Sequence, residues 1–308
     1  MAMADIAARG PIPISRNSLH KVMQRKSTIA FLMTLPLILL ILVLVAYPAG
    51  YAVYLAMLNK GMTRFVGLGN FEFLFGRELF WMVVYQSCLF TFTAVVFKVT
   101  IGFVVAHFVH NIPSKGQRKW RGMLLVPWVI PPAMGTLAWR WLFDPSYSAF
   151  NWILEHVGLD RISWLGETGW ARFSVILVNV WFGAPFFMIM YLASLKSVPE
   201  ELYEAAAIDG ATWWQRIRYV TLPMMRNILA ITVLFSLIGT FASFDIVAVL
   251  TNGGPLRTTH VFATMAFVVG IFSSDMPLGA SVSLFMLPIL AVAATFILRG
   301  IAKRGSEV

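Results

Sequence analysis

Long apolar runs separated by shorter polar stretches dominate this chain. Six runs reach the length of a membrane span, which is about 20 residues for a helix crossing a hydrocarbon core about 30 Å thick. We therefore expect an all-α integral membrane protein with six transmembrane helices. The predicted spans cover residues 29–55, 80–110, 122–143, 173–195, 227–250 and 277–299. A further helix over 258–271 is too short to span and should pack near the outer surface.

Composition agrees with this membrane assignment. Hydrophobic residues make up 59% of the 308 positions and charged residues only 12%, and the mean hydropathy is +0.76. A soluble domain contains about 25% charged residues. The pattern predicts a cytoplasmic tail at 1–28, a six-span domain at 29–301 and a second cytoplasmic tail at 302–308. The single cysteine, Cys88, excludes an intrachain disulfide framework and a cysteine-rich metal site.

The basic residues indicate how the chain is oriented. If both termini lie inside, sixteen of the 24 lysines and arginines fall in inner segments and six in outer segments, with Lys98 and Arg140 inside spans. Cytoplasmic loops carry such an excess of positive charge. The net charge of +10 therefore reflects topology, and we expect no nucleic-acid partner. The same distribution of basic residues places residues 196–226 in the cytoplasm.

The stretch from residue 200 to residue 223 is polar and separates two apolar spans. Pro199 favours a helix start, and Glu200 and Glu204 would lie near the positive end of that helix. Gly210 should break the helix, and a second amphipathic turn then leads to Pro223. We expect a bent pair of short helices on the membrane surface. An alternative from these residues alone is an interfacial helix that only anchors the loop.

This stretch resembles the EAA signature of permease subunits of ATP-binding-cassette importers. Glu204-Ala205-Ala206 is followed after three residues by Gly210, and after nine more by Val220-Thr221-Leu222-Pro223. Segments 65–71, 139–145 and 251–258 also look like parts of carbohydrate-uptake permeases of this superfamily. The resemblance covers nearly the whole chain from residue 29 onward. The permeases that the chain resembles are those of the maltose and glycerol-phosphate type.

The resemblance implies the fold of a type I importer permease, with a cytoplasmic coupling helix between the fourth and fifth spans. The coupling loop is 197–224, and the residues expected to engage the ATPase are Glu204, Ala205, Ala206, Asp209, Gly210, Leu222 and Pro223. Implied partners are a second, homologous permease, two ATPase subunits, an extracytoplasmic solute-binding protein and membrane lipid. The implied location is the bacterial inner membrane.

Motifs for chemistry are missing from the chain. It has no phosphate-binding G-x-x-x-x-G-K-[ST] loop and no G-x-S-x-G elbow, and its five histidines lack metal-ligand spacing. His107 and His110 share a helix face at the cytoplasmic boundary, where we expect interfacial polar residues and not ligands. We therefore expect no enzyme activity and no bound cofactor or metal; ATP and Mg would bind the partner ATPases.

A path for solute should be sought at polar positions within spans, because such residues are costly against lipid. In the fourth span, Asn179, Phe182, Gly183 and Phe186 share one helix face. An amide, two rings and a small residue would suit a sugar. Helix packing around a bonded asparagine is an equally good explanation from the residues alone.

The fifth span carries a second polar stripe, formed by Ser236, Thr240 and Ser243. These hydroxyls alone favour packing, because serine and threonine often bond back to their own helix. Resemblance to the maltose permease places the sugar contacts on the two faces just described. The fifth-span positions here are small hydroxyls, where the maltose permease has asparagines.

Three charged residues lie within spans. Lys98 is about 18 Å from the inner end of its span, so it either snorkels or faces the interior. Arg140 could pair with Asp245 across helices, but Asp144, four residues along the same helix, is the more economical partner. A cationic site for an anionic substrate is a further alternative for these in-span charges.

We expect a permease subunit of an ATP-driven, binding-protein-dependent importer that moves a sugar, polyol or related glycoside by alternating access. A phosphorylated polyol such as glycerol 3-phosphate is an alternative solute. An ion-coupled secondary carrier would need no ATPase dock and usually shows internal repeats, and a membrane enzyme would need a catalytic constellation that is absent.

Overall fold

The computed structural model describes residues 26–305, which form helices and connecting loops without a β-strand. Most of the predicted 1–28 tail and the end of the 302–308 tail therefore lie outside the described residues. The chain divides into two compact units, residues 1–54 and residues 55–308. Each unit is described by itself.

The described part of the first unit lies in one long apolar helix, which continues to Ala56. It is built from α2 (Lys26–Ile41), the π-helical turn η1 (Leu42–Ala46) and α3 (Tyr47–Ala56). The π-helical turn comes just before Pro48, which cannot donate a backbone hydrogen bond, and a widened turn accommodates such a residue. The segment Ile29–Ala56 is 28 residues long, and no part of its most apolar stretch is buried. The predicted first span over 29–55 is thus confirmed as a helix long enough to cross a membrane.

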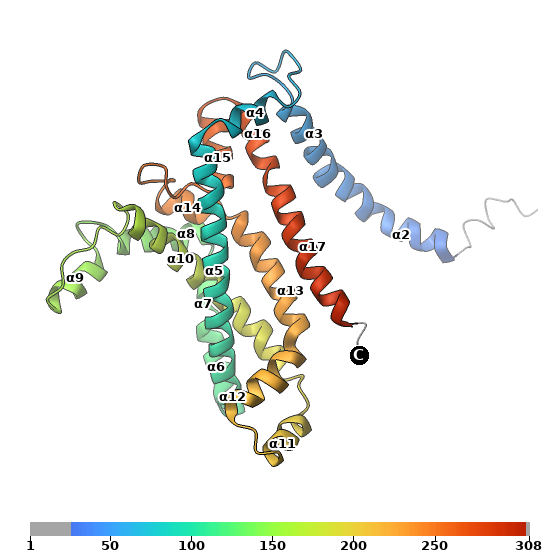
Figure 1. Ribbon diagram of the computed structural model, residues 1–308, viewed down its shortest axis with the longest axis vertical. Helices are drawn as coiled ribbons and strands as arrows, with labels where there is room; N and C mark the ends of the chain where they lie inside the picture. The colour runs from blue at the N-terminus through green and yellow to red at the C-terminus, as the bar shows by residue number, and fades with distance from the viewer. Residues whose placement is uncertain (1–25, 306–308) are drawn as a thin grey trace, which may run out of the picture. The chain divides into compact units, whose positions relative to one another are not determined.

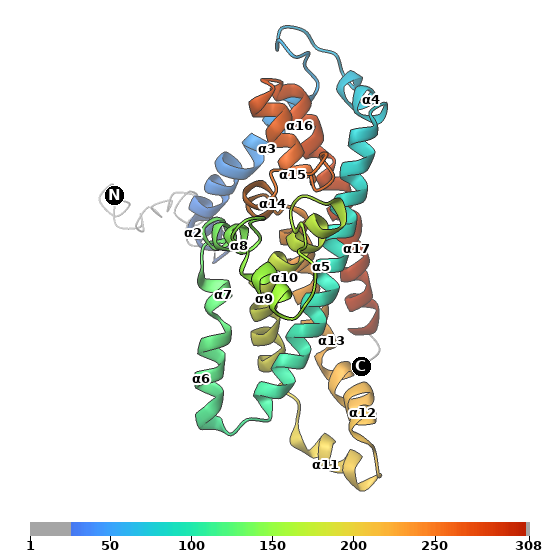
Figure 2. The ribbon, with the colours of Figure 1, turned by 90° about the vertical axis from the view of Figure 1, so that its left-hand side faces the viewer.

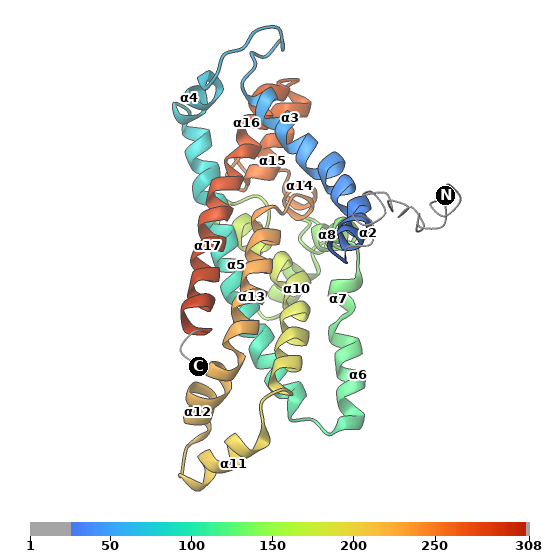
Figure 3. The same ribbon diagram turned by 90° about the vertical axis from the view of Figure 1, so that its right-hand side faces the viewer.

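The second unit is a bundle whose centre is a pair of long helices. α5 (Glu78–His110) packs along α10 (Thr168–Leu195), α13 (Leu222–Phe241) packs against both, and α17 (Met286–Gly305) packs against α13 (Figures 1 and 3). Gly102 of α5 allows the close approach, because a Cβ there would collide with Phe187 of α10. The predicted spans at 80–110 and 173–195 are confirmed.

The predicted third span is not a single helix. Residues 122–143 are divided among the end of α6 (Ser114–Leu124), the single turn α7 (Val126–Val129) and α8 (Pro132–Leu142) (Figure 2). Pro131 and Pro132 explain the break after α7, because proline removes a backbone donor and disfavours helix in the residue before it. The membrane crossing of this segment stays a prediction.

The later spans also differ in their boundaries from the prediction. The apolar helix expected at 227–250 begins earlier, at Trp213, and ends at Phe241; after a break, α14 (Asp245–Leu250) follows. The short helix expected at 258–271 begins later, as α15 (Phe262–Phe267) continued by η3 (Val268–Phe272). α16 (Met276–Leu284) leads into α17, and together they form an apolar stretch from Met276 to Ile301.

The loop between α14 and α15 is held by its own side chains. The Thr251 and Thr259 hydroxyls are 2.8 Å apart, and the Thr259 hydroxyl also donates to the Gly254 carbonyl at 2.6 Å. His260 is buried beside Gly253, whose φ of +81° and lack of room for a Cβ both require glycine. Burial and, secondarily, the charge of Arg257 lower the pKa of His260. The loop is therefore built around a buried imidazole.

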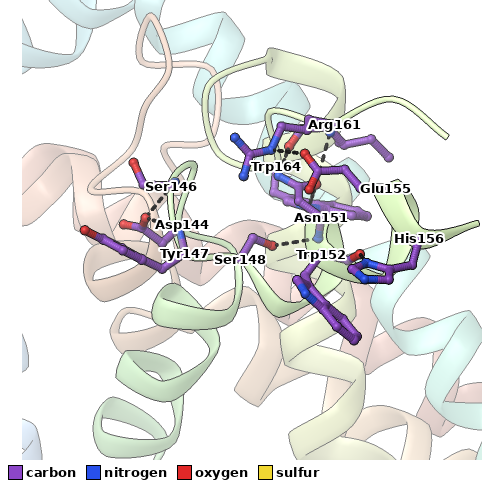
Figure 4. A network of polar contacts seen from close by, with 11 residues as sticks. Asp144, Ser146, Tyr147, Ser148, Asn151, Trp152, Glu155, His156, Arg161 and Trp164 are labelled. Carbon is purple, nitrogen blue, oxygen red and sulfur yellow. Dashed lines mark hydrogen bonds and ion pairs between the residues drawn. The ribbon is translucent and has the colours of Figure 1, made fainter. Parts of the chain in front are cut away.

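A polar network organises the 143–167 loop, which contains α9 (Ala149–His156) and connects α8 to α10 (Figure 4). Asn151 lies at its centre and is 1% exposed. Its Nδ2 donates to the Ile162 carbonyl at 3.0 Å, and its Oδ1 accepts from the Ile162 N–H at 3.1 Å and the Trp164 Nε1–H at 2.9 Å. This buried amide is well satisfied by the chain itself.

Candidate functional site

The polar loop between α10 and α13 contains two short helices. α11 (Glu200–Ile208) and α12 (Trp213–Arg216) are separated by Gly210, which has a φ of +72°. Glycine adopts this left-handed conformation without the steric penalty that other residues pay. The bend that the sequence predicts at Gly210 is therefore present.

The second helix of the loop does not stop at Pro223. The Thr212 hydroxyl accepts from the Gln215 N–H, and the Gln215 side chain accepts from the Thr212 N–H, which closes a capping box at the start of α12. The helix then passes through the π-helical turn η2 (Ile217–Thr221) and continues as α13, so Trp213–Phe241 is one helix of 29 residues. The amphipathic turn expected before Pro223 is therefore continuous with the next span, because the wider π-helical turn carries the helix past the proline.

The residues expected to engage an ATPase lie on the surface of this loop. Of the seven, Ala206 is half-buried and the others are exposed, and α11 buries none of its residues. Ile208 at the end of α11 is 87% exposed, which is unusual for a large aliphatic side chain. The geometry leaves the loop free for a partner, and the coupling role of these residues stays a prediction.

One side-chain contact between the loop and the bundle is the hydrogen bond from Trp213 Nε1 to His107 Nε2 of α5, at 3.2 Å. Within the loop itself, the Tyr203 and Thr221 hydroxyls are 3.0 Å apart. A cavity of about 710 Å³ lies between the loop and the end of α5, lined in part by His107, His110 and Arg216. His107 is thus a contact between the span and the loop, which the sequence did not reveal.

A second cavity, of about 560 Å³, lies within the bundle. We call it the central cavity. Its lining includes the seven candidate solute-binding residues from both predicted stripes: Asn179, Phe182, Gly183, Phe186, Ser236, Thr240 and Ser243. α10 provides the first four and α13, with the turn that follows it, provides the others. The structure brings together two faces that the sequence could identify only separately.

Asn179 has an unusual environment in the central cavity. Its side chain is 6% exposed, and its Oδ1 is buried without a hydrogen-bond partner among the described residues. Buried amide oxygens are normally satisfied by the protein or by water. The helix-packing explanation required a bonded neighbour for this asparagine, and the described part of the chain provides none for Oδ1.

The hydrogen bonds of the fifth-span hydroxyls also differ from those that the packing explanation predicts. Within the described residues, the side chains of Ser236, Thr240 and Ser243 do not donate back to their own helix, whereas Thr232 does so, to the Ile228 carbonyl at 2.6 Å. The Thr240 hydroxyl instead accepts from Lys98 Nζ at 2.9 Å. These hydroxyls are therefore directed to the cavity and to α5.

Lys98 is the cavity residue that sequence reasoning did not assign to the site. It is 5% exposed and lines the central cavity from α5, so it faces the interior and does not snorkel. A Cβ at Gly183 would lie 2.5 Å from Lys98 Cε and 2.7 Å from Cδ. The room that Gly183 leaves is thus filled by the lysine stem. A lysine in the middle of an apolar span was the available signal.

The predicted ion pairs of Arg140 do not form. Arg140 Nη1 donates to the Val249 carbonyl at 3.3 Å, and no ion pair joins it to Asp144 or Asp245 in the described chain. Asp144 Oδ1 accepts instead from the N–H groups of Ser146 and Tyr147. The backbone turn after α8 satisfies the carboxylate locally, so both pairings proposed from the sequence are wrong.

The described helices include five that are long and apolar enough to cross a membrane, as expected of a multi-pass membrane protein. Residues 98–304 match the family described as "Binding-protein-dependent transport system inner membrane component". The chain belongs to this family, whose members are permease subunits of ATP-binding-cassette importers with ATP hydrolysis on a separate subunit. It is a permease of the carbohydrate-uptake type in the inner membrane, and it is not itself an enzyme.

Several of the similar proteins are named for carbohydrate transport. The chain is 32% identical over 259 residues to the trehalose/maltose transport system permease protein MalF of Thermococcus litoralis, covering 82% of this chain and 87% of that protein. A crystal structure of a bacterial ABC transporter that imports the acidic polysaccharide alginate matches with a TM-score of 0.80 and 25% identity, covering 93% of this chain and 98% of that one. The alginate transporter in complex with a pentasaccharide-bound periplasmic protein matches with a TM-score of 0.79 and 26% identity, covering 91% and 95%.

Proposed function

We propose that this subunit moves a sugar, polyol or related glycoside through the central cavity by alternating access. The observation that carries the proposal is the convergence of the seven candidate residues on one cavity of about 560 Å³. The unsatisfied Asn179 Oδ1 can accept from a solute hydroxyl, and the rings of Phe182 and Phe186 offer apolar faces to a pyranose. The trehalose/maltose and alginate relatives support a carbohydrate solute.

A single helix provides a mechanical link between the two sites. Trp213–Phe241 begins in the cytoplasmic loop and carries Ser236 and Thr240 at the central cavity. A subunit that moves the loop therefore moves one wall of the cavity. We propose that ATP-driven closure of the ATPase pair acts through this helix and exposes the cavity alternately to the two sides of the membrane.

The same proposal assigns partners. The exposed α11, with Glu204 and Ile208, would dock on an ATPase, and one such loop per chain implies two permeases for two ATPases. We propose a second, related permease that completes the cavity wall, and a binding protein that delivers solute to the outer loops. The periplasmic protein bound to the alginate transporter supports the last assignment.

Orientation can be tested by cysteine labelling in a Cys88→Ser background, because Cys88 is the only cysteine and is exposed. Cysteines at Ser114 and Thr212 should be protected from an impermeant thiol reagent in intact cells, whereas cysteines at Thr63 and Leu256 should be labelled. All four positions are exposed in the described structure, so protection reports sidedness and not burial. Labelling of Thr212Cys from outside would refute the ATPase-docking role of the loop.

Function is tested by reconstituting the importer in liposomes with its binding protein. We expect ATP-dependent uptake of the carbohydrate that co-purifies with the binding protein, identified by mass spectrometry. Uptake that persists without ATPase subunits would support an ion-coupled carrier, and a binding protein loaded with a non-carbohydrate would refute the proposed solute class.

A further inference from the structure

Lys98 places its amino group in the interior of the bundle. It lies about 18 Å along α5 from the inner end of that helix, and its side chain is only 5% exposed. An ammonium group loses its hydration when it is buried, and this loss is offset only by counter-charge or hydrogen bonds. A lysine that served only to pack the helices could be replaced at lower cost by a methionine of similar length.

The chain leaves this ammonium group incompletely satisfied. It has three donors, and the described structure provides one acceptor, the Thr240 hydroxyl at 2.9 Å. Among the residues that the structure describes, the central cavity has one carboxylate in its lining, that of Asp245, and no ion pair joins it to Lys98. Asp245 is exposed and lies in the first turn of α14, where the helix N-terminus stabilises its charge.

Gly183 and Thr240 hold the ammonium group at the cavity. The stem of Lys98 passes over Gly183, where any side chain would collide with it, and Thr240 fixes Nζ on the opposite helix. The same cavity contains the unpartnered Oδ1 of Asn179, which is an independent second observation. A cation with free donors and an amide oxygen with a free lone pair require a ligand that carries both an anionic oxygen and a hydroxyl.

We propose that Lys98 is an anion-binding subsite of the central cavity, so that the transported solute carries a negatively charged oxyacid group, such as a carboxylate, sulfonate or phosphate, beside its hydroxyls. This inference rests on the proposed carbohydrate transport through the cavity and narrows its substrate class. Lys98 is then a specificity-determining residue that discriminates acidic from neutral sugars.

The test uses the assembled importer in nanodiscs, without binding protein, so that only the internal site is probed. Glucuronate and glucose are compared, since they differ in a carboxylate against a hydroxymethyl group, and apparent dissociation constants are read from the ligand dependence of the melting temperature. Glucuronate should bind the wild type at least about tenfold more tightly than glucose, the effect expected of a hydrogen bond to a charged group. Lys98→Met should remove this difference, and Lys98→Arg should largely retain it.

Controls separate the subsite from general electrostatics. Lys60→Met removes an exposed lysine outside the cavity and should leave the preference intact. If a free oxyanion is enough for binding, sulfate should stabilise the wild type more than chloride does at equal ionic strength, and should not stabilise Lys98→Met. Stabilisation by glucuronate but not by sulfate would show that the sugar ring is also required for binding.

Two outcomes would overturn the subsite. Equal affinity of glucose and glucuronate for the wild type, with no effect of sulfate, would mean that Lys98 is neutralised from within the assembly, for instance by a carboxylate of the second permease. A preference for glucuronate that persists in Lys98→Met would place anion binding elsewhere. Neither result would affect uptake of a neutral sugar, which tests the proposed function separately.

Discussion

The 143–167 loop and the central cavity each bury an asparagine, and the two differ in how that asparagine is satisfied. Asn151 is 1% exposed and exchanges hydrogen bonds with Ile162 and Trp164. Asn179 is 6% exposed, and its Oδ1 has no partner in the described chain. The first amide has its hydrogen-bond partners within its own loop. The second is complete only when something else enters the cavity, as expected of a binding site.

The loop between α10 and α13 resembles the cavity in this respect. Its helix α11 buries none of its residues and presents Ile208 almost fully to solvent, whereas Asn151 and Phe150 of α9 pack within their own loop. Both candidate regions thus leave polar or apolar groups without partners among the described residues. The 143–167 loop provides matched controls for each of them.

The largest effect is expected for Gly210→Val. A β-branched residue at a φ of +72° is strained, so the bend should open and displace α11 from its ATPase. Hydrolysis stimulated by loaded binding protein, measured on the reconstituted importer, should fall to the unstimulated rate. Gly158→Val is the matched control: Gly158 has a φ of +79° in the 143–167 loop, and like Gly210 it has no heavy atom near its missing Cβ. If both variants lose stimulation equally, the loop has no special role.

A smaller effect is expected for Asn179→Ala. Loss of the amide removes an acceptor for a solute hydroxyl, and the internal site should weaken by about 1 to 3 kcal/mol, or about five- to a hundredfold. Uptake should fall while the melting temperature and stimulated hydrolysis are largely retained. Asn151→Ala should do the reverse, lowering the melting temperature, because the Ile162 and Trp164 groups lose their partner. A lower melting temperature for Asn179→Ala, with uptake and hydrolysis falling together, would identify a packing asparagine.

The smallest effect is expected for Gly183→Ala. The new Cβ would lie 2.5 Å from Lys98 Cε, so the flexible lysine end must move while the helix backbone stays in place. We expect uptake to fall a few-fold, roughly the worth of one weakened hydrogen bond, with little change in melting temperature. Gly239→Ala lines the same cavity but has open space at its Cβ, and it should transport normally. Equal loss in both variants would show that cavity volume, and not the position of Lys98, is what matters.

Local features of this fold could be predicted from the sequence because their causes are local. The long apolar helices at 80–110 and 173–195 follow from runs of apolar residues, and the bend at Gly210 follows from one residue that tolerates a left-handed backbone. The helical periodicity also placed Asn179 with Gly183, and Ser236 with Thr240, on common faces. Boundaries were less predictable: α-helical hydrogen bonding alone would have ended the helix near Pro223, whereas a π-helical turn carries it through.

Only the tertiary structure decided that the polar faces of α10 and α13 line one cavity together with Lys98 of α5. A periodic stripe is a property of one helix, so it cannot reveal that α5 inserts Lys98 between the faces of α10 and α13. The same limit explains the error at Arg140, whose partner is a carbonyl from α14, 109 residues away in sequence. The sequence by itself determined the long apolar helices, the bend at Gly210 and two polar stripes. Long-range packing decided the cavity, its buried cation and its unsatisfied amide, because each depends on contacts between helices that the chain brings together only on folding.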